Sequence, residues 1–239
     1  MFVRERLERW IHLNMALVGG FIGGFSILNH HDLFGSAQTA NMITLALEFT
    51  GRERTDLLLR LGGLLCYIMG LAATVILPMV FRINMKYLSI VVDFVSILIV
   101  GFLPRNLPDF VALYPLFLSM SIQWCSFKGA EGYVSSTIFS TNNLRQCVTS
   151  YVEYLCSKDV KAYKKAKLYG KVLLSFHIGA ALSCVCYLLW GVHGVWCGLI
   201  PLLPAAVLVF VEQSHVPVWR VRLWLGLKWM HPAHLRSME

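Results

Sequence analysis

Charged residues are scarce in this chain. Lysine, arginine, aspartate and glutamate make up 14% of its 239 residues, whereas hydrophobic residues make up 57%. Soluble domains average about 25% charged residues. This shortage, together with a mean hydropathy of +0.63, excludes an ordinary water-soluble domain. Long apolar runs instead predict helices that have a lipid bilayer as their solvent.

The chain also lacks the motifs of catalysis and metal binding. It has no nucleophile motif, phosphate-binding loop, metal-protease helix or heptad run. Its seven cysteines show no CxxC pair and no zinc-ligand spacing. Adjacent histidines on one short turn, such as His30 and His31 beside Asp32, rarely converge on a metal, so a surface loop is the better interpretation. We therefore expect no enzyme, no metal and no cofactor.

Eight apolar segments are candidates for crossing a bilayer, which takes about 20 residues of helix, with a range of 17–25. The second and the sixth are marginal, because they carry polar triplets. They are full spans, broken helices or re-entrant elements. The predicted fold is an all-α integral membrane protein with about 6–8 transmembrane segments. The segments are Ile11–Leu28, Leu33–Phe49, Leu57–Phe81, Tyr87–Leu103, Phe110–Phe127, Gly132–Tyr154, Leu168–Trp190 and Val195–Val211.

The net charge of +8 comes from basic residues in short segments between the apolar runs, as topology signals do. We therefore expect no nucleic-acid partner. With eight crossings, most basic segments share one side with both termini, which the positive-inside rule makes cytoplasmic. Six spans plus two re-entrant elements is the alternative. The inside would hold Arg4, Arg6, Arg9, Arg52, Arg54, Arg105, Lys158, Lys161, Lys164, Lys165, Lys167 and the tail; the outside would hold Asn29–Asp32, Arg82, Lys86, Lys128 and His193.

Two polar triplets, Thr39-Ala40-Asn41 and Ser140-Thr141-Asn142, lie about 101 residues apart within apolar segments. The same offset pairs Gly20-Phe21-Ile22 with Ser121-Ile122-Gln123. These matches predict two internal repeats, related by an axis along the membrane normal. The predicted divisions are a cytoplasmic N-terminal segment, 1–10; a first repeat, 11–103; a second repeat, 110–212; and a basic, aromatic interfacial tail, 213–239, that includes Trp219, Arg220 and Trp224.

Interrupted polar segments in matching places of two halves indicate a transporter's binding site. Asparagine and glutamine offer both donors and acceptors, which suits a polar neutral solute or a small anion. Pseudo-symmetry would bring Asn41 and Asn142 near each other at the midplane. The predicted solute-binding residues are Thr39, Asn41, Gln123, Ser140, Asn142 and Arg145.

Two ionisable residues lie near the middle of apolar segments. An acid such as Asp93 costs about 2.5–3.5 kcal/mol at the bilayer centre on insertion scales, so it must face protein or water. Asp93 and His177 are the candidates for proton coupling, with structural hydrogen bonding as the alternative for each. Arg145 binds an anionic group, pairs with Asp93 or extends to the inner surface. The glycines Gly19, Gly20, Gly23 and Gly24 form two small-xxx-small pairs that let helices approach closely.

In these stretches the chain resembles the YoaK-like family of small multi-spanning bacterial membrane proteins of unknown function. The stretches are Gly20-Phe21-Ile22-Gly23-Gly24, Thr39-Ala40-Asn41, Ser121-Ile122-Gln123-Trp124 and Ser140-Thr141-Asn142. The family's first-helix acid is Gly23 here, and the amide after its glutamine is Trp124. The resemblance implies a protein of the bacterial inner membrane, plausible as a transporter, without supplying a substrate.

The leading hypothesis is therefore a secondary transporter or facilitator of a small polar organic solute or anion. The alternative is a non-transporting membrane scaffold that binds a partner. An intramembrane enzyme is the weakest reading, because no catalytic constellation is present. The expected partners are the lipid bilayer and a small solute, and a homodimer is left open.

Overall fold

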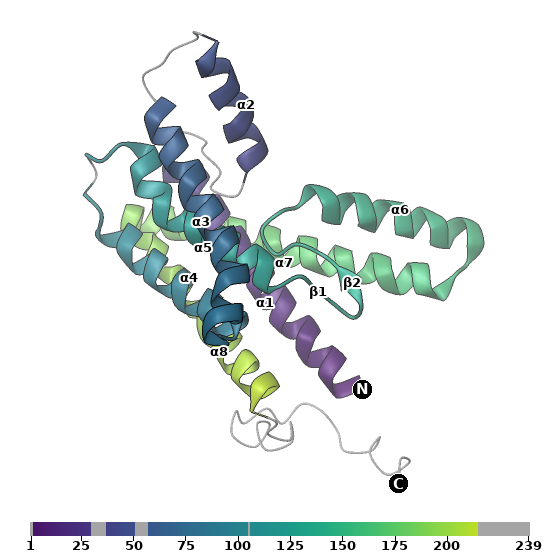
Figure 1. Cartoon of the computed structure of the whole chain (residues 1–239). Helices are drawn as coiled ribbons and strands as arrows, with labels where there is room; N and C mark the ends of the chain where they lie inside the picture. Colours follow the sequence, from purple (N-terminus) through teal and green to yellow (C-terminus); the bar gives the residue numbers. More distant parts are fainter. Residues whose placement is uncertain (1, 30–36, 51–56, 105, 215–239) are drawn as a thin grey trace.

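The computed structural model describes residues 2–29, 37–50, 57–104 and 106–214. Its elements are helices apart from one short hairpin (Figure 1). The predictions for His30–Asp32, Arg52, Arg54, Arg105 and the tail from residue 215 lie outside the described residues. The elements are α1 (Phe2–Asn29), α2 (Gln38–Phe49), α3 (Leu57–Phe81), α4 (Met85–Phe102), α5 (Asp109–Ser126), β1 (Gly129–Ala130), β2 (Tyr133–Val134), α6 (Thr141–Ser157), α7 (Val160–Trp190), the 3-10 helix η1 (Gly191–Gly198) and α8 (Leu199–Gln213).

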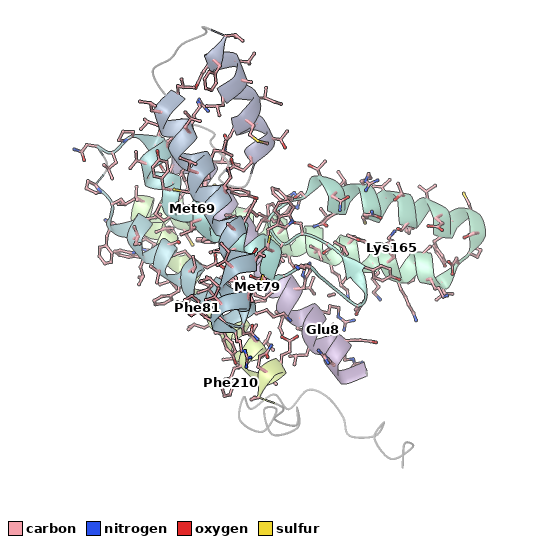
Figure 2. The ribbon with its side chains drawn as sticks, in the orientation of Figure 1. Glu8, Met69, Met79, Phe81, Lys165 and Phe210 are labelled. Atoms are coloured by element: carbon pink, nitrogen blue, oxygen red, sulfur yellow. The ribbon has the colours of Figure 1, made fainter. Side chains whose placement is uncertain are left out.

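Four helical stretches of the described residues are long and apolar enough, by length and composition, to cross a membrane. The predicted class of all-α membrane protein is confirmed at this level. Apolar side chains point outward from these helices, among them Met69, Met79 and Phe81 on α3 and Phe210 on α8 (Figure 2). The stretches are Arg4–Asn29, Leu57–Phe81, Met85–Phe102 and Val160–Gln213, the last of which comprises α7, η1 and α8.

The two marginal segments are built differently from the rest. The described part of the second is α2, which has 12 residues and is shorter than the roughly 20 that a span requires. The sixth is not one helix. It begins with strand β2, continues without helix through residues 135–140, and becomes α6 only at Thr141. Of the alternatives for the sixth segment, the structure therefore shows an interrupted segment and not one continuous helix.

Glycines bring two pairs of helices into close parallel contact. On α1, a side chain at Gly20 would collide with the Phe176 carbonyl of α7, and one at Gly24 would collide with Ser183. The residue numbers at these contacts increase along α1 and along α7 together, so the two helices run in the same direction. The predicted packing role of Gly20 and Gly24 is confirmed.

The helices α3 and α5 cross in the same way. Gly62 lies against Tyr114, and Gly70 lies against Ser121, so these two helices also run parallel. The Tyr114 hydroxyl donates to the Leu59 carbonyl at 2.8 Å and joins the starts of the two helices.

Ion pairs identify which helix ends lie together. Lys86 at the start of α4 binds Glu212 at the end of α8, at 2.7 Å, and Arg9 at the start of α1 binds Glu131 in the β1–β2 turn. We call this the N-terminal end of the bundle. The predicted eight crossings place Lys86 outside and the end of the last segment inside, so this part of the prediction is wrong.

The opposite end of the bundle gathers the other helix termini. The His193 Nδ1 lies 3.2 Å from the Gly101 carbonyl, which joins η1 to the last turn of α4. Here α7 ends at Trp190 and is followed by Gly191, whose φ of +58° favours glycine. The eight-crossing scheme separates His193 from the α4–α5 connection, so this contact contradicts it too.

Two helical arms leave the bundle (Figure 1). The helix α2 packs on α3, and α6 packs on the first part of α7. The turn of the second arm has Lys158 in the left-handed region, and Asp159 caps α7 by accepting from the Lys161 N–H at 2.9 Å. The apolar core lies between α1, α4, α5, η1 and α8.

Candidate functional site

A polar segment without helix is buried in the core of the bundle. In residues 135–140, which follow β2, the side chains of Ser135 and Thr137 are almost completely inaccessible. Thr137 packs against Gly19 of α1, where any larger side chain would collide with the Thr137 carbonyl. The absence of a side chain at Gly19 therefore lets this segment lie directly against α1.

Gln123 of α5 joins the three parts of this region. Its Nε2 donates to the Met15 carbonyl of α1 at 2.9 Å and to the Thr137 hydroxyl at 3.0 Å. The side chain is completely buried, yet its Oε1 has no hydrogen-bond partner among the described residues. A buried amide oxygen without a donor costs about 1–3 kcal/mol, so Gln123 keeps an unsatisfied acceptor inside the bundle.

His12 of α1 adds a second polar pair that the sequence analysis missed. Its Nε2 lies 2.5 Å from the Ser135 hydroxyl, and its Nδ1 has no partner among the described residues. The side chain is 1% exposed. Its position near the start of the first apolar segment was a usable signal, because a histidine in such a run needs a hydrogen-bond partner.

Asn143 fastens the segment to the first turn of α6. Its Oδ1 accepts from the Ser136 N–H at 3.2 Å, and its Nδ2 donates to the carbonyls of Ser136 at 2.7 Å and Phe139 at 3.0 Å. Ser140, a predicted solute residue, stands at the helix start without capping it, and its buried hydroxyl has no partner in the described chain.

Asn142 and Arg145 lie on the outer side of the same helix start. Both are exposed, and the Arg145 Nη2 donates to the Asn142 Oδ1 at 2.9 Å. Arg145 therefore pairs with its own helix and not with Asp93, which corrects one of the alternatives drawn from the sequence. The first turn of α6 thus presents the Asn142 amide and the Arg145 guanidinium on its exposed side.

The first polar triplet, Thr39-Ala40-Asn41, lies in the first turn of α2. Thr39 is exposed, Asn41 is half-buried, and Ala37 at the N-cap position supplies no side-chain cap. The helices α2 and α6 each pack mainly on the helix that follows them. They are not packed along each other, so the approach of Asn41 to Asn142 stays a prediction.

The two predicted coupling residues lie on different helices. Asp93 is completely buried on the face of α4 that packs against α5. His177 is exposed on α7, and its Nδ1 lies 2.7 Å from the Leu173 carbonyl. Only Asp93 thus faces the bundle interior.

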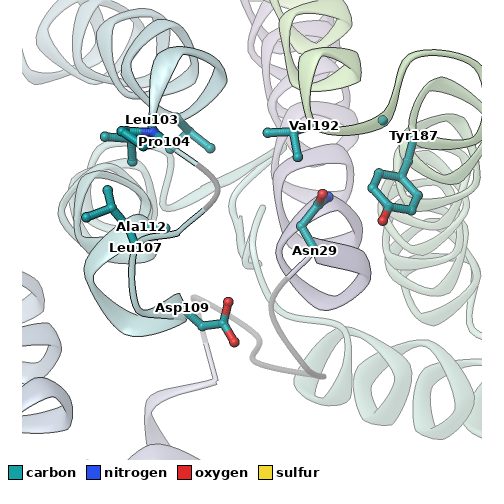
Figure 3. Close-up of a pocket in the computed structure, with 10 residues that line it drawn as sticks. Asn29, Leu103, Pro104, Leu107, Asp109, Ala112, Tyr187 and Val192 are labelled. Carbon is teal, nitrogen blue, oxygen red and sulfur yellow. The ribbon is translucent and has the colours of Figure 1, made fainter.

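A pocket of about 280 Å³ opens at the end of the bundle opposite the N-terminal end (Figure 3). Asn29 at the end of α1, Asp109 at the start of α5 and Tyr187 of α7 contribute its polar groups. At 1.5 Å of helix rise per residue, Ala112, which lines the pocket from the first turn of α5, lies about 16 Å from Gln123. The pocket and the buried polar groups around Gln123 therefore lie at different heights along the bundle.

Comparison with known proteins supplies a family and no characterised relative. The model of the DUF1275 family, described as a protein of unknown function, matches residues 11–210. No curated protein and no solved structure matches the chain.

Proposed function

Because the chain belongs to the DUF1275 family, which is the YoaK-like family indicated by its motifs, we propose a function from the arrangement of its own residues. The chain is a helical membrane protein of a family of unknown function. Our proposal is a secondary transporter or facilitator of a small polar organic solute or anion, without catalytic activity.

The observation that carries the proposal is the interrupted sixth segment. Residues 135–140 leave the helical path among buried side chains, between α1 and α5. Irregular backbone at membrane depth is tolerated only where protein buries it or where it lines a cavity. Broken helices of this kind form the substrate sites of many transporters.

The packing of the helices supports two repeats. The helix α1 packs on α7 and α8, and α5 packs on α3 and α4. The same relation extends to single residues: Gly179 of α7 meets the Leu17 carbonyl, and Gly70 of α3 meets the Leu118 carbonyl. Leu17 and Leu118 are separated by about 101 residues, the offset of the polar triplets.

The directions of the helices favour inverted repeats. In the first unit α1, α3 and α4 would cross the membrane, and in the second α5, α7 and α8 would cross it. Three crossings reverse the direction of the chain, so the second unit starts from the opposite side. We therefore propose six crossings related by an axis in the membrane plane, in place of the axis along the normal, with α2 and α6 as re-entrant elements.

The proposed solute site uses the starts of these two re-entrant helices. A helix start carries unpaired N–H groups and a partial positive charge, which suits an anion or a polar acceptor. Neither α2 nor α6 has a side-chain cap. The proposed solute residues are Thr39, Asn41, Gln123, Ser140, Asn142 and Arg145, and the pocket beside Asn29 is the proposed opening of the path at the far end.

Asp93 is the proposed coupling residue, and His177 is the second candidate. A carboxylate inside a bundle is tolerated when a proton or another cation neutralises it. Asp93 is completely buried and forms no ion pair with the described basic residues. His177 lies at the surface of α7, so a coupling role for it would require a rearrangement of that helix.

The distribution of charge supports a cytoplasmic N-terminal end in a bacterial inner membrane. Arg9 and Lys86 lie at this end through their ion pairs. The lysine-rich start of α7 belongs to the arm that α7 forms with α6, and Lys171 of α7 lies near Arg9 and Glu131. Lys165 stands on this arm in Figure 2. By the positive-inside rule this end faces the cytoplasm.

A ligand screen tests the proposal. Purified protein is melted with nucleobases, small carboxylates, amino acids and inorganic anions, because a ligand that binds the native state raises the melting temperature. Any hit is then measured with Asn142→Ala and Gln123→Met. The control is Gln213→Met, since Gln213 is exposed at the end of α8.

A hit that both site variants abolish and the control retains supports the proposal, and flux of that solute in proteoliposomes completes it. A hit that all three variants retain contradicts the site. If no solute stabilises well-folded protein, transport is contradicted and the scaffold alternative takes its place.

A further inference from the structure

An oxygen-rich group lies inside the bundle between α4 and α5. Ser89, Asp93 and Ser96 follow one another at helical spacing on the buried face of α4. Ser119 of α5 lies beside the Asp93 carboxylate from the opposite helix, and Ser89 lies beside it from one turn earlier. All four side chains are at most 3% exposed.

The oxygens of this group have unused hydrogen-bonding capacity. Both carboxylate oxygens of Asp93 and the hydroxyl of Ser89 make no hydrogen bond of good geometry in the described chain. The Ser119 hydroxyl has only a long contact of 3.5 Å with the Leu116 carbonyl. Polar groups in a protein interior are rarely left in this condition without a reason.

Ser89 differs from three other buried serines of the helices, although Ser150 of α6 also has an unpaired hydroxyl among the described residues. The hydroxyls of Ser26, Ser121 and Ser183 each donate to a carbonyl of the preceding turn, at 2.7–2.8 Å. This local bond satisfies a helical serine without any outside partner. The Ser89 hydroxyl does not form it, so its oxygen stays available next to the Asp93 carboxylate.

The charge of the group defines what it can hold. One carboxylate carries one negative charge, and no described lysine, arginine or histidine neutralises it by an ion pair. A monovalent cation makes the site neutral, whereas a divalent cation leaves a buried positive charge, which is costly. Hard cations prefer oxygen ligands such as carboxylates, hydroxyls and carbonyls.

We propose that Asp93, Ser89 and Ser119 bind a sodium ion between α4 and α5. Four side-chain oxygens converge from two helices that pack directly on each other, which favours a small ion. As the coupling ion of the transporter this inference rests on the proposed function, but the binding of sodium does not.

The test measures sodium binding to the full chain without any solute. Melting temperature and equilibrium binding of radioactive sodium are followed while NaCl replaces choline chloride at constant ionic strength and pH, with KCl in parallel. We expect saturable binding specific for sodium. Asp93→Asn should abolish it, and Ser89→Ala or Ser119→Ala should weaken it about tenfold, the loss of one good ligand contact of about 1.4 kcal/mol.

The matched control is Ser96→Ala. Ser96 lies on the same face of α4, but its hydroxyl donates to the Pro115 carbonyl at 3.0 Å, so sodium binding should not change. Asp93→Asn removes a buried charge and should fold, which size-exclusion chromatography verifies.

Three results would overturn the sodium site: no sodium-specific effect in the wild type, equal binding in Asp93→Asn, or a melting temperature that follows pH and ignores sodium. The last would assign the carboxylate to protons alone. Because no solute is present, these failures are distinct from a failed ligand screen, which leaves the sodium result standing.

Discussion

The Lys86 ammonium lies 2.7 Å from both carboxylate oxygens of Glu212. This ion pair joins the start of α4 to the end of α8, although 126 residues separate them along the chain. The pair therefore places the α3–α4 connection at the same end of the bundle as the last turn of α8.

Labelling from the two membrane surfaces should follow this pairing. In a variant without its seven cysteines, single cysteines at Arg4, Lys128 and His193 would be treated with a membrane-impermeant maleimide. We expect Arg4→Cys and Lys128→Cys to react from the same side, because Arg9 binds Glu131, and His193→Cys to react from the other. Reaction of Lys128→Cys together with His193→Cys would restore the eight-crossing arrangement.

Gly179 should tolerate no side chain. A Cβ there would strike the Leu17 carbonyl, which belongs to backbone and cannot move aside. We expect Gly179→Ala to destabilise the protein by about 1–3 kcal/mol, the usual cost of overpacking. Thermal unfolding in detergent measures this cost.

The control for Gly179 is on the same helix. At Gly170 a Cβ would meet only the Cys147 sulfur at 3.6 Å, an ordinary contact. Gly170→Ala should be neutral or stabilising by up to about 1 kcal/mol, since alanine favours helix. Equal losses at both positions would indicate that the α1–α7 contact is not what limits Gly179.

Substitutions of the two neighbouring asparagines at the start of α6, Asn142 and Asn143, should have different effects on protein stability and on solute binding. Asn143→Ala removes three hydrogen bonds that hold residues 136–139, and each buried group left unpaired costs about 1–3 kcal/mol. We expect a clear drop in melting temperature. Asn142→Ala removes only an exposed contact with Arg145, so it should unfold like the wild type while losing the solute. An Asn143→Ala variant that is as stable as the wild type would refute the role of Asn143 in holding residues 136–139 to α6.

Arg60 should hold the α2 arm in place. Its Nε binds Glu48 at 2.6 Å, and its guanidinium lies 4.4 Å above the Phe110 ring. Because Glu48 is 7% exposed, Arg60→Ala leaves a buried charge without a partner, which costs about 3 kcal/mol or more. Hydrogen exchange should increase in α2 and stay unchanged in α6. As control, Arg4→Ala breaks an exposed pair with Glu8 and should change little.

The sequence predicted best what depends on local hydropathy. The bounds of Leu57–Phe81 agree with α3, because a long apolar run without polar interruption leaves one helical solution in a bilayer. The close-packing glycines were also identifiable, since Gly20 and Gly24 share one face of α1.

What depends on tertiary pairing could not be predicted. Nothing local indicates that Lys86 meets Glu212, or that residues 135–140 return into the core to meet His12 and Gln123. The apolar residues of Gly132–Tyr154 resemble a single weak span, whereas the hydrogen bonds that stabilise the break in this segment come from α1 and α5.

Helices of the first half pack on helices of the second half. The order of synthesis therefore determines when each helix can meet its packing partners. The helix α1 packs chiefly on α7, so Leu17 must wait for a residue about 160 positions later. At about 5–20 residues per second this is a delay of roughly 8 to 30 s. During that time α1 has its glycine face unpaired in the bilayer, and the first half does not acquire its full set of neighbours before α7 and α8 have been made. Two halves made as separate chains would have to find each other to be stable, and each alone should be a substrate for membrane proteases.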